Sequence, residues 1–382
     1  MKAFENRGLV EETTKICPPP PALHASSFLD ENASVSTGAS SRIAWIDICR
    51  VYAIFAIIVG HTNIRTCFPS PPAALSWMVV LLEVGSVSPF FFLSGYFTKP
   101  CSHSWFNWQR VKMLLFPFII WSCVGYVLFP LFEQIGGELD FSYLWKNRPW
   151  EMLGTFWSVS TPGHWDLWFM KVLIFWTIFA VILARLSSIS LLCLVLLAFS
   201  LSFAFEYPVV KHIPFFLETS SLEGLGFFAL GIWCRRFVAL DSIARQLQHR
   251  LFSLISLKIF LSIALVFSIP WGMNALPGLS YRAFQILVLF CIGIAVMKYM
   301  PRLGVRMARF GEAVFFVYIM QEFLIHFLRS LFKAYPVISP NAYALVPFAV
   351  MAASLAFFFL IKKMFPSLMP YLCMAKNPCA RQ

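Results

Sequence analysis

The sequence predicts an all-α fold class, a polytopic membrane helical bundle of about ten transmembrane helices. Three observations lead to this prediction. Hydrophobic residues make up 59% of the 382 residues, charged residues make up 13%, and the mean hydropathy is +0.74. Apolar runs recur along the chain with the length of about 20 residues that a helix needs to cross the hydrocarbon core. These runs are continuous rather than alternating, which is the pattern of helices and not of membrane-spanning strands.

The composition excludes several classes of protein. The charged share is about half of that in soluble globular domains, which excludes a soluble enzyme and a disordered protein. The net charge of +12 could indicate nucleic acid, but in a membrane protein it reflects basic cytoplasmic loops. We therefore expect the lipid bilayer as a partner and no nucleic acid. The ten Cys are scattered without CxxC or metal-ligand spacing, so neither a disulfide framework nor a metal site is expected.

The chain divides into three predicted parts. Residues 1–41 are polar and contain a run of four prolines, so we expect a disordered cytoplasmic tail. Residues 42–364 form the ten-span membrane domain, and residues 365–382 form a short cytoplasmic tail. The first apolar run begins near Ile43 without a small-residue cleavage site, which indicates an uncleaved first span rather than a signal peptide.

Ten apolar runs are the predicted spans. They are Ile43–Ile64, Leu75–Phe97, Val111–Phe132, Trp165–Ala184, Ser190–Phe205, Leu222–Ala239, Phe252–Trp271, Tyr281–Tyr299, Glu312–Leu331 and Ala342–Ile361. The loops after the even-numbered spans carry most of the loop Lys and Arg, and the opposite loops carry most of the loop acids. The positive-inside rule then places both termini in the cytoplasm of a protein of the plasma or inner membrane.

The first span carries three ionisable residues, Asp47, Arg50 and His61. Ten uncharged residues separate Arg50 from His61, so a span of normal length includes all three. Helical geometry places Arg50 and His61 about 20° apart around the axis and ~16 Å apart along it, with Asp47 on the same side. Charge inside a bilayer is costly and needs a partner, a cavity or a function. The three residues either form a structural ion pair and a buried core histidine, or they line a functional path that faces the interior of the helical bundle.

Polar residues on other spans could join this path. Glu83 on the second span could reach the depth of His61 and orient its ring, or it could pair with another base. Ser94 and Gly95 are a small pair for which close helix packing is the default interpretation. His164 and Asp166 lie at the external mouth of the fourth span, where they either bind a polar acceptor or are solvated boundary residues.

The ninth span and the loop after the second span add further candidates. Glu322 falls near mid-membrane with His326 one turn beyond it on the same face, next to Gln321. The pair could bind substrate, orient His61 or only stabilise packing. Arg110 could meet an anionic ligand at the cytoplasmic surface or be an ordinary positive-inside residue.

The order of these motifs resembles the acyltransferase-3 family of multi-spanning membrane acyltransferases. The resemblance covers residues 42–364. The similar segments are Arg42–Arg50 with Gly60 and His61, Phe90–Phe97, Arg110 with Pro117, Leu167–Phe169, and Phe310–Glu312 with Tyr318. The spacing of Arg, ten residues and His is reproduced by Arg50 and His61. The family's late segment usually ends in His, and here that position is Gln321.

The resemblance implies an O-acetyltransferase that moves an acyl group, expected to be acetyl, from acyl-CoA to a hydroxyl of a cell-envelope or periplasmic saccharide. Acetyl-CoA is the expected donor and no metal is required. The catalytic set would be His61, Arg50 and Glu83, with His61 as general base. In the donor-binding set of Arg50, Asp47 and Arg110, the two arginines would bind the donor's phosphates and Asp47 would fix the guanidinium of Arg50. His164, Asp166 and Glu322 would bind the acceptor.

Two other functions fit the same sequence. A transporter or flippase for a polar envelope precursor would also have interior charges on many spans, although the two halves show no evident repeat. A non-catalytic relative would be explained by Gln321 in place of the family's histidine.

Overall fold

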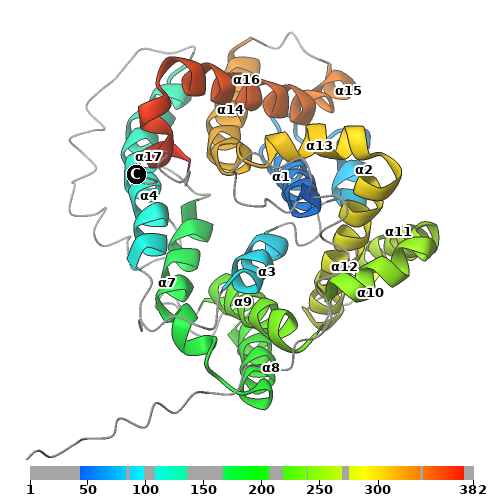
Figure 1. Cartoon of the computed structure of the whole chain (residues 1–382). Helices are drawn as coiled ribbons and strands as arrows, with labels where there is room; N and C mark the ends of the chain where they lie inside the picture. The colour runs from blue at the N-terminus through cyan, green and yellow to red at the C-terminus, as the bar shows by residue number, and fades with distance from the viewer. Residues whose placement is uncertain are drawn as a thin grey trace, which may run out of the picture. The chain divides into compact units, whose positions relative to one another are not determined.

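The computed structural model describes residues 44–82, 87–98, 108–135, 167–205, 218–238, 240–268, 275–335 and 339–373. Throughout these ranges the regular secondary structure is helical, without a strand (Figure 1). The predicted all-α class is therefore confirmed. The predicted tail at residues 1–41 lies outside the described residues, as do residues 374–382 of the second predicted tail.

The helices keep the order of the predicted spans, with short helices between some of them. They are α1 (Ala44–Ile64), α2 (Ala73–Leu82), α3 (Ser88–Tyr96), α4 (Trp108–Glu133), α7 (Trp168–Leu183), α8 (Ser188–Phe205), α9 (Thr219–Phe237), α10 (Leu240–Leu247), α11 (Leu251–Ser268), α12 (Ala275–Tyr299), α13 (Pro301–Phe310), α14 (Val314–Ala334), α15 (Pro340–Tyr343), α16 (Val346–Met364) and α17 (Met369–Leu372). Proline in the first two positions starts α3, α13, α15, α16 and α17, where the missing N–H has no intrahelical partner to lose.

Among the described residues, six helices are long and apolar enough to cross a membrane. They are Ala44–Ile64, Trp108–Phe129, Ser242–Ala264, Ser280–Tyr299, Val314–Ala334 and Val346–Met364. Shorter apolar helices cover Ala73–Leu82, Trp168–Leu183 and Ser188–Ala204. A helix of 16 residues such as α7 is ~24 Å long, less than the ~30 Å of hydrocarbon. The number of ten crossings therefore stays a prediction.

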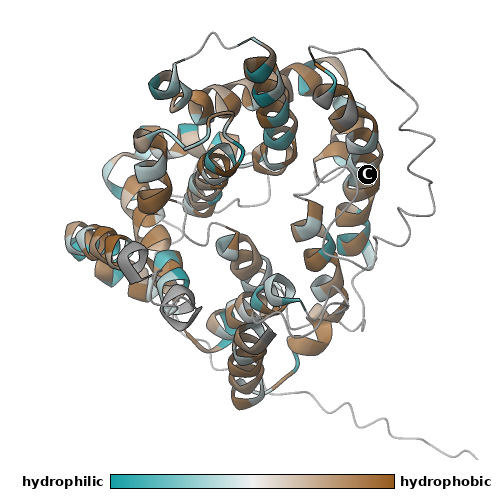
Figure 2. Ribbon diagram, turned by 180° about the vertical axis from the view of Figure 1, so that it is seen from behind, coloured by the Kyte–Doolittle hydropathy of each residue, from teal (hydrophilic) through white to brown (hydrophobic). Residues whose placement is uncertain are grey.

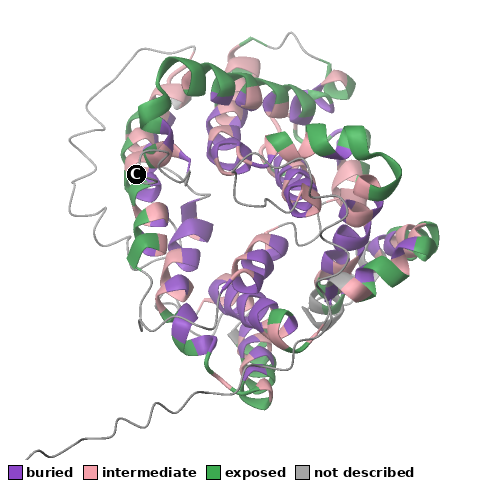
Figure 3. Cartoon of the chain, in the orientation of Figure 1, coloured by how far each residue is buried: buried purple, intermediate pink, exposed green. Residues whose placement is uncertain are grey.

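Helix α1 is the central element of the part that the structure describes. It packs against α2, α3, α12, α13, α14 and α16, and Figure 3 shows it largely buried, whereas α13 and α16 carry many exposed residues. Ile54, Ile58 and Val59 of α1 are completely buried. A polar side chain on α1 is therefore held by several neighbouring helices at once.

Helices α3 and α9 make a close backbone contact that depends on glycine. A Cβ atom on Gly95 would lie 1.9 Å from the carbonyl oxygen of Phe228, and one on Gly231 would lie 2.1 Å from that of Phe92. Because both sites face backbone atoms, no side-chain movement could relieve the overlap. The contact agrees with the packing interpretation of Ser94 and Gly95.

Several helices consist largely of hydrophobic residues, as the brown ribbons of Figure 2 show, and many of their large apolar side chains are exposed. On α11, Phe252 and Phe260 are exposed by 85% and 67%. Continuous exposed apolar surface is unfavourable in water, whereas it is the surface that lipid chains cover. Beyond α16, the helix α17 packs back on α4, where the indole of Trp121 donates to the carbonyl of Leu372 at 3.2 Å.

Candidate active site

A cluster of polar residues inside the described helices joins the C-terminal end of α1 to the middle of α14. His61 is the α1 member, and its Nδ1 lies 2.8 Å from Nε2 of Gln321 and 3.7 Å from Oε2 of Glu322. The side chain of Glu322 is completely buried, whereas that of His61 keeps 22% of its surface accessible. A partly accessible ring beside a buried carboxylate has the arrangement of an oriented acid–base group.

Two further residues surround the carboxylate of Glu322. Arg65 places Nη2 2.5 Å from Oε1, and His326 places Nε2 3.2 Å from the same oxygen. Arg65 also contacts the His326 ring. A buried carboxylate is tolerated only when cationic groups and hydrogen-bond donors hold its charge. Glu322, predicted to bind substrate or to orient His61, lies behind the His61 ring, which is the position that the orienting role requires.

Arg65 was not predicted from the sequence as part of the site. Its backbone N–H donates to the carbonyl oxygen of His61 at 2.9 Å, so the helical hydrogen bonding of α1 extends one residue past Ile64. Residues four apart lie on one helix face, and this spacing from His61 is the signal that would have identified Arg65.

The chemistry of His61 depends on which ring nitrogen carries the proton. With the Gln321 amide nitrogen donating to Nδ1 at 2.8 Å, the proton of the neutral ring is on Nε2. If the Gln321 amide is turned by half a turn, its oxygen faces His61 instead. Nδ1–H then donates to this oxygen, and Nε2 carries the basic lone pair. The second arrangement provides a general base.

The N-terminal end of α1 carries the Asp47–Arg50 pair. The Arg50 Nη1 lies 3.0 Å from Oδ1 of Asp47, which is 2% exposed, whereas the Arg50 side chain is 35% exposed. Gly311 makes room for this pair, since a Cβ there would lie 2.4 Å from the Cβ of Asp47. The Arg50 guanidinium also lies 5.9 Å from the ring centroid of Phe97. The fork of Arg50 is thus anchored on one side and accessible on the other, about 16 Å along α1 from His61.

Arg110 is directed at the last turn of α3. Its Nη1 donates to Oγ1 of Thr98 at 3.0 Å, and its Nη2 donates to the carbonyl oxygen of Ser94 at 2.7 Å. The terminal carbonyls of a helix lack intrahelical donors and attract cations. The structure therefore gives Arg110 a role in holding α3, and its binding of the donor stays a prediction.

Three predicted site residues lie outside the described residues: Glu83, His164 and Asp166. No group of three His, Cys, Asp or Glu able to hold a metal ion occurs among the residues that the structure describes.

Three segments that are far apart in the sequence meet through their aromatic rings. Phe169 of α7 lies 4.7 Å from Phe91 of α3 and 5.5 Å from Tyr318 of α14, measured between ring centroids. Tyr318 is one turn before Gln321 on α14, so these rings lie close to the segment that supports His61. Aromatic packing of this kind fixes the helices in relation to one another.

A comparison of the sequence with models of protein families shows the family to which this chain belongs. The acyltransferase-3 family model, described as an acyltransferase domain, matches residues 43–363, which is most of the chain. The chain belongs to the acyltransferase-3 family. No curated protein and no solved structure matches it.

The family membership confirms the resemblance found in the motifs. With the six apolar helices, it makes this acyltransferase-3 protein an integral membrane acyltransferase. Both the Arg50–Asp47 pair and the His61 cluster lie on α1, inside the matched range.

Proposed function

We propose that the protein transfers an acetyl group from acetyl-CoA to a hydroxyl of a cell-envelope saccharide. The observation that carries this proposal is the pairing of two groups on α1: a partly accessible guanidinium at one end and a carboxylate-backed imidazole at the other. The acyltransferase family supplies the reaction class, and these two groups suit an anionic donor and a hydroxyl acceptor.

His61 is the proposed general base. The hydroxyl oxygen attacks the thioester carbonyl carbon, a C–O bond forms, and the hydroxyl proton moves to Nε2 of His61. The C–S bond then breaks, and the proton passes from Nε2 to the departing thiolate to give free coenzyme A. Glu322 and Gln321 hold Nδ1 during these steps.

Arg50 is the proposed contact for the donor at the inner face. Asp47 fixes its guanidinium from the buried side, which leaves donors for the phosphate oxygens of coenzyme A. The long pantetheine arm would then extend along α1 toward His61. We place this reaction in a plasma or inner membrane with both termini cytoplasmic, because the basic loops favour that orientation.

The test uses membranes that contain the full chain, labelled acetyl-CoA and cell-envelope saccharide. Transfer of label to the saccharide is expected, and mass spectrometry of the product identifies the acetylated position. His61→Ala and Arg50→Ala should each reduce transfer by at least about 100-fold, in the range of a lost acid–base group, while the protein still inserts. An Arg245→Gln variant, exposed and far along the chain from the site, is the matched control.

The outcomes separate the alternatives. Normal transfer by both α1 variants would overturn the assigned roles. Transport of a saccharide precursor without any acetyl transfer would support the transporter instead. A wild-type protein that folds and binds neither donor nor acceptor would support the non-catalytic relative.

A further inference from the structure

Helix α13 is a short amphipathic helix whose exposed face is strongly basic. Arg302, Arg306 and Arg309 are all exposed, and helical geometry places them within an arc of about 60°. Gly304 is buried on the other side, where an added Cβ would lie 2.5 Å from the sulfur of Met297. One face of α13 is therefore packed and the other is an uninterrupted cationic stripe.

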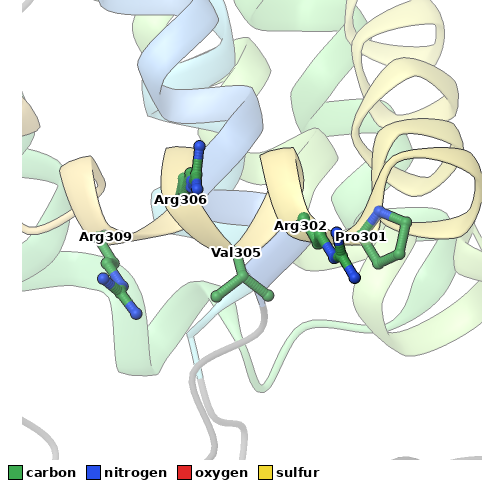
Figure 4. Close-up of a pocket in the computed structure, with 5 residues that line it drawn as sticks. All are labelled: Pro301, Arg302, Val305, Arg306 and Arg309. Carbon is green, nitrogen blue, oxygen red and sulfur yellow. The ribbon is translucent and has the colours of Figure 1, made fainter.

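The stripe borders an open hollow. Arg302, Arg306 and Arg309 line it together with Pro301 and Val305, and its volume is about 490 Å³. In Figure 4, Arg302 and Arg309 extend with Val305 along one edge of α13, and Arg306 extends from the opposite edge. The three guanidinium groups thus do not converge on one protein atom.

No carboxylate is paired with these three arginines among the described residues. Other cations do have such partners, as Arg282 has Glu223 and Lys362 has Glu312. Like charges three and four residues apart on a helix repel one another. An anion bound between them would remove this repulsion.

The stripe lies at the same end of α1 as Arg50. An added Cβ on Gly304 would lie 3.5 Å from Cδ1 of Ile48, and Gly311, directly after α13, contacts Asp47. Both contacts are on the first turns of α1. Helix α13 therefore packs beside the end of α1 that carries Arg50, with its arginines on the exposed face.

We propose that Arg302, Arg306 and Arg309 form a phosphate-binding site for the nucleotide end of the acyl donor. The inference rests on the proposed function, in which the donor is a coenzyme A thioester. Its nucleotide carries a 3′-phosphate and a diphosphate, and guanidinium forks bind phosphate oxygens in pairs. The stripe would hold the nucleotide at the surface while Arg50 meets the start of the pantetheine arm.

The experiment measures binding of coenzyme A and dephospho-coenzyme A to the full chain in detergent by titration calorimetry. The test variant is R302Q/R306Q/R309Q. The control variant, R245Q/R250Q/K363Q, also removes three positive charges, but from exposed residues outside the hollow. The test variant should bind coenzyme A at least about tenfold more weakly, and the control should stay within about twofold. In the wild type, dephospho-coenzyme A should bind more weakly than coenzyme A, and the test variant should lose this difference.

A second measurement uses the unaltered protein, in case the triple variant does not fold. Phenylglyoxal modifies accessible arginines, and mass spectrometry maps the sites. Coenzyme A should protect Arg302, Arg306 and Arg309 but not Arg245. Absence of protection would overturn the proposal.

The remaining outcomes distinguish the sources of phosphate. Equal binding of coenzyme A by wild type and test variant, with acetyl transfer intact, would overturn this site and leave the proposed function standing. If the wild type neither binds coenzyme A nor transfers acetyl, both fail. If the test variant loses co-purified phosphatidylglycerol but keeps its affinity for coenzyme A, the stripe binds lipid headgroups, and the proposal is wrong.

Discussion

The contact between Glu322 and Arg65 is expected to be a large contributor to the stability of the α1–α14 contact. The substitution Glu322→Gln keeps the shape of the side chain and removes its charge. Arg65, whose side chain is 17% exposed, would lose the carboxylate 2.5 Å from its Nη2. Breaking a buried ion pair from one side costs about 3–5 kcal/mol, because the other charge stays buried. Since Arg65 also contacts His326, we expect the lower end, about 3 kcal/mol.

A double-mutant cycle isolates the pair from the other contacts of Glu322. Arg65→Gln alone should also destabilise, whereas Glu322→Gln with Arg65→Gln should cost much less than the sum of the single effects. The expected coupling energy is about 2–3 kcal/mol. The assay is the free energy of unfolding in mixed detergent micelles, followed by tryptophan fluorescence. The matched control is Glu223→Gln, which breaks the more accessible pair with Arg282 and should cost about 1 kcal/mol or less.

The result that would refute this reasoning is additivity. Polar contacts between membrane helices average only about 0.6 kcal/mol in comparable cycles. A coupling energy at or below that level would mean that this pair is no stronger than an ordinary polar contact, and the expected value of about 2–3 kcal/mol would be wrong. A companion measurement follows acetyl transfer, because Glu322 also lies 3.7 Å from His61. Transfer should fall in Glu322→Gln even where detergent conditions keep the variant folded.

Further predictions concern packing, helix termination and orientation. Gly95→Ala should lower the free energy of unfolding by about 3 kcal/mol, because the new Cβ would meet backbone atoms of α9. Gly224→Ala should lower it less, because its Cβ would meet only the Phe91 ring 2.9 Å away. Equal unfolding free energies of the two variants would contradict this. Arg110→Gln should lower the free energy of unfolding by about 1.5–3 kcal/mol through the lost donors to α3, and an unchanged value would argue against that anchoring role. Burial raises the pKa of the Cys67 thiol. A membrane-impermeant maleimide added outside should therefore label this thiol slowly at pH 7 and faster at higher pH, where more thiolate forms. If mass spectrometry shows that Cys67 is labelled only from the cytoplasmic side, the proposed orientation is reversed.

Much of the helical fold could be predicted because hydrophobic length is a strong signal. The predicted Ile43–Ile64, Tyr281–Tyr299 and Ala342–Ile361 coincide with α1, α12 and α16 to within a few residues, apart from the earlier start of α12. The second predicted span instead overlaps two helices, α2 and α3. Pro89 is the second residue of α3, and apolar runs give no information on such a division because both halves are equally hydrophobic.

The site was predicted in part. Periodicity along one helix placed Arg50 beside Asp47, because residues three apart share a face. Neither hydropathy nor spacing could show that α14 meets α1 with Glu322 against His61, because this contact joins residues 261 positions apart. The same reason explains the stripe on α13, because a single sequence does not show which helix packs beside it. Arg65 could have been identified from its spacing of four residues from His61, but its contact with Glu322 could not.

The glutamine at position 321 decides how the cluster is understood. The family's usual histidine there could exchange a proton with its neighbours, whereas an amide cannot change its charge. Gln321 nevertheless keeps a 2.8 Å contact with Nδ1 of His61, and it can donate or accept at that nitrogen. Losing a second titratable ring therefore does not remove the base. Among the described residues, it leaves His61 as the more accessible of the two imidazoles in the cluster, since His326 is held between Arg65 and the buried Glu322. The substitution is compatible with an active acyltransferase in which one histidine carries the proton.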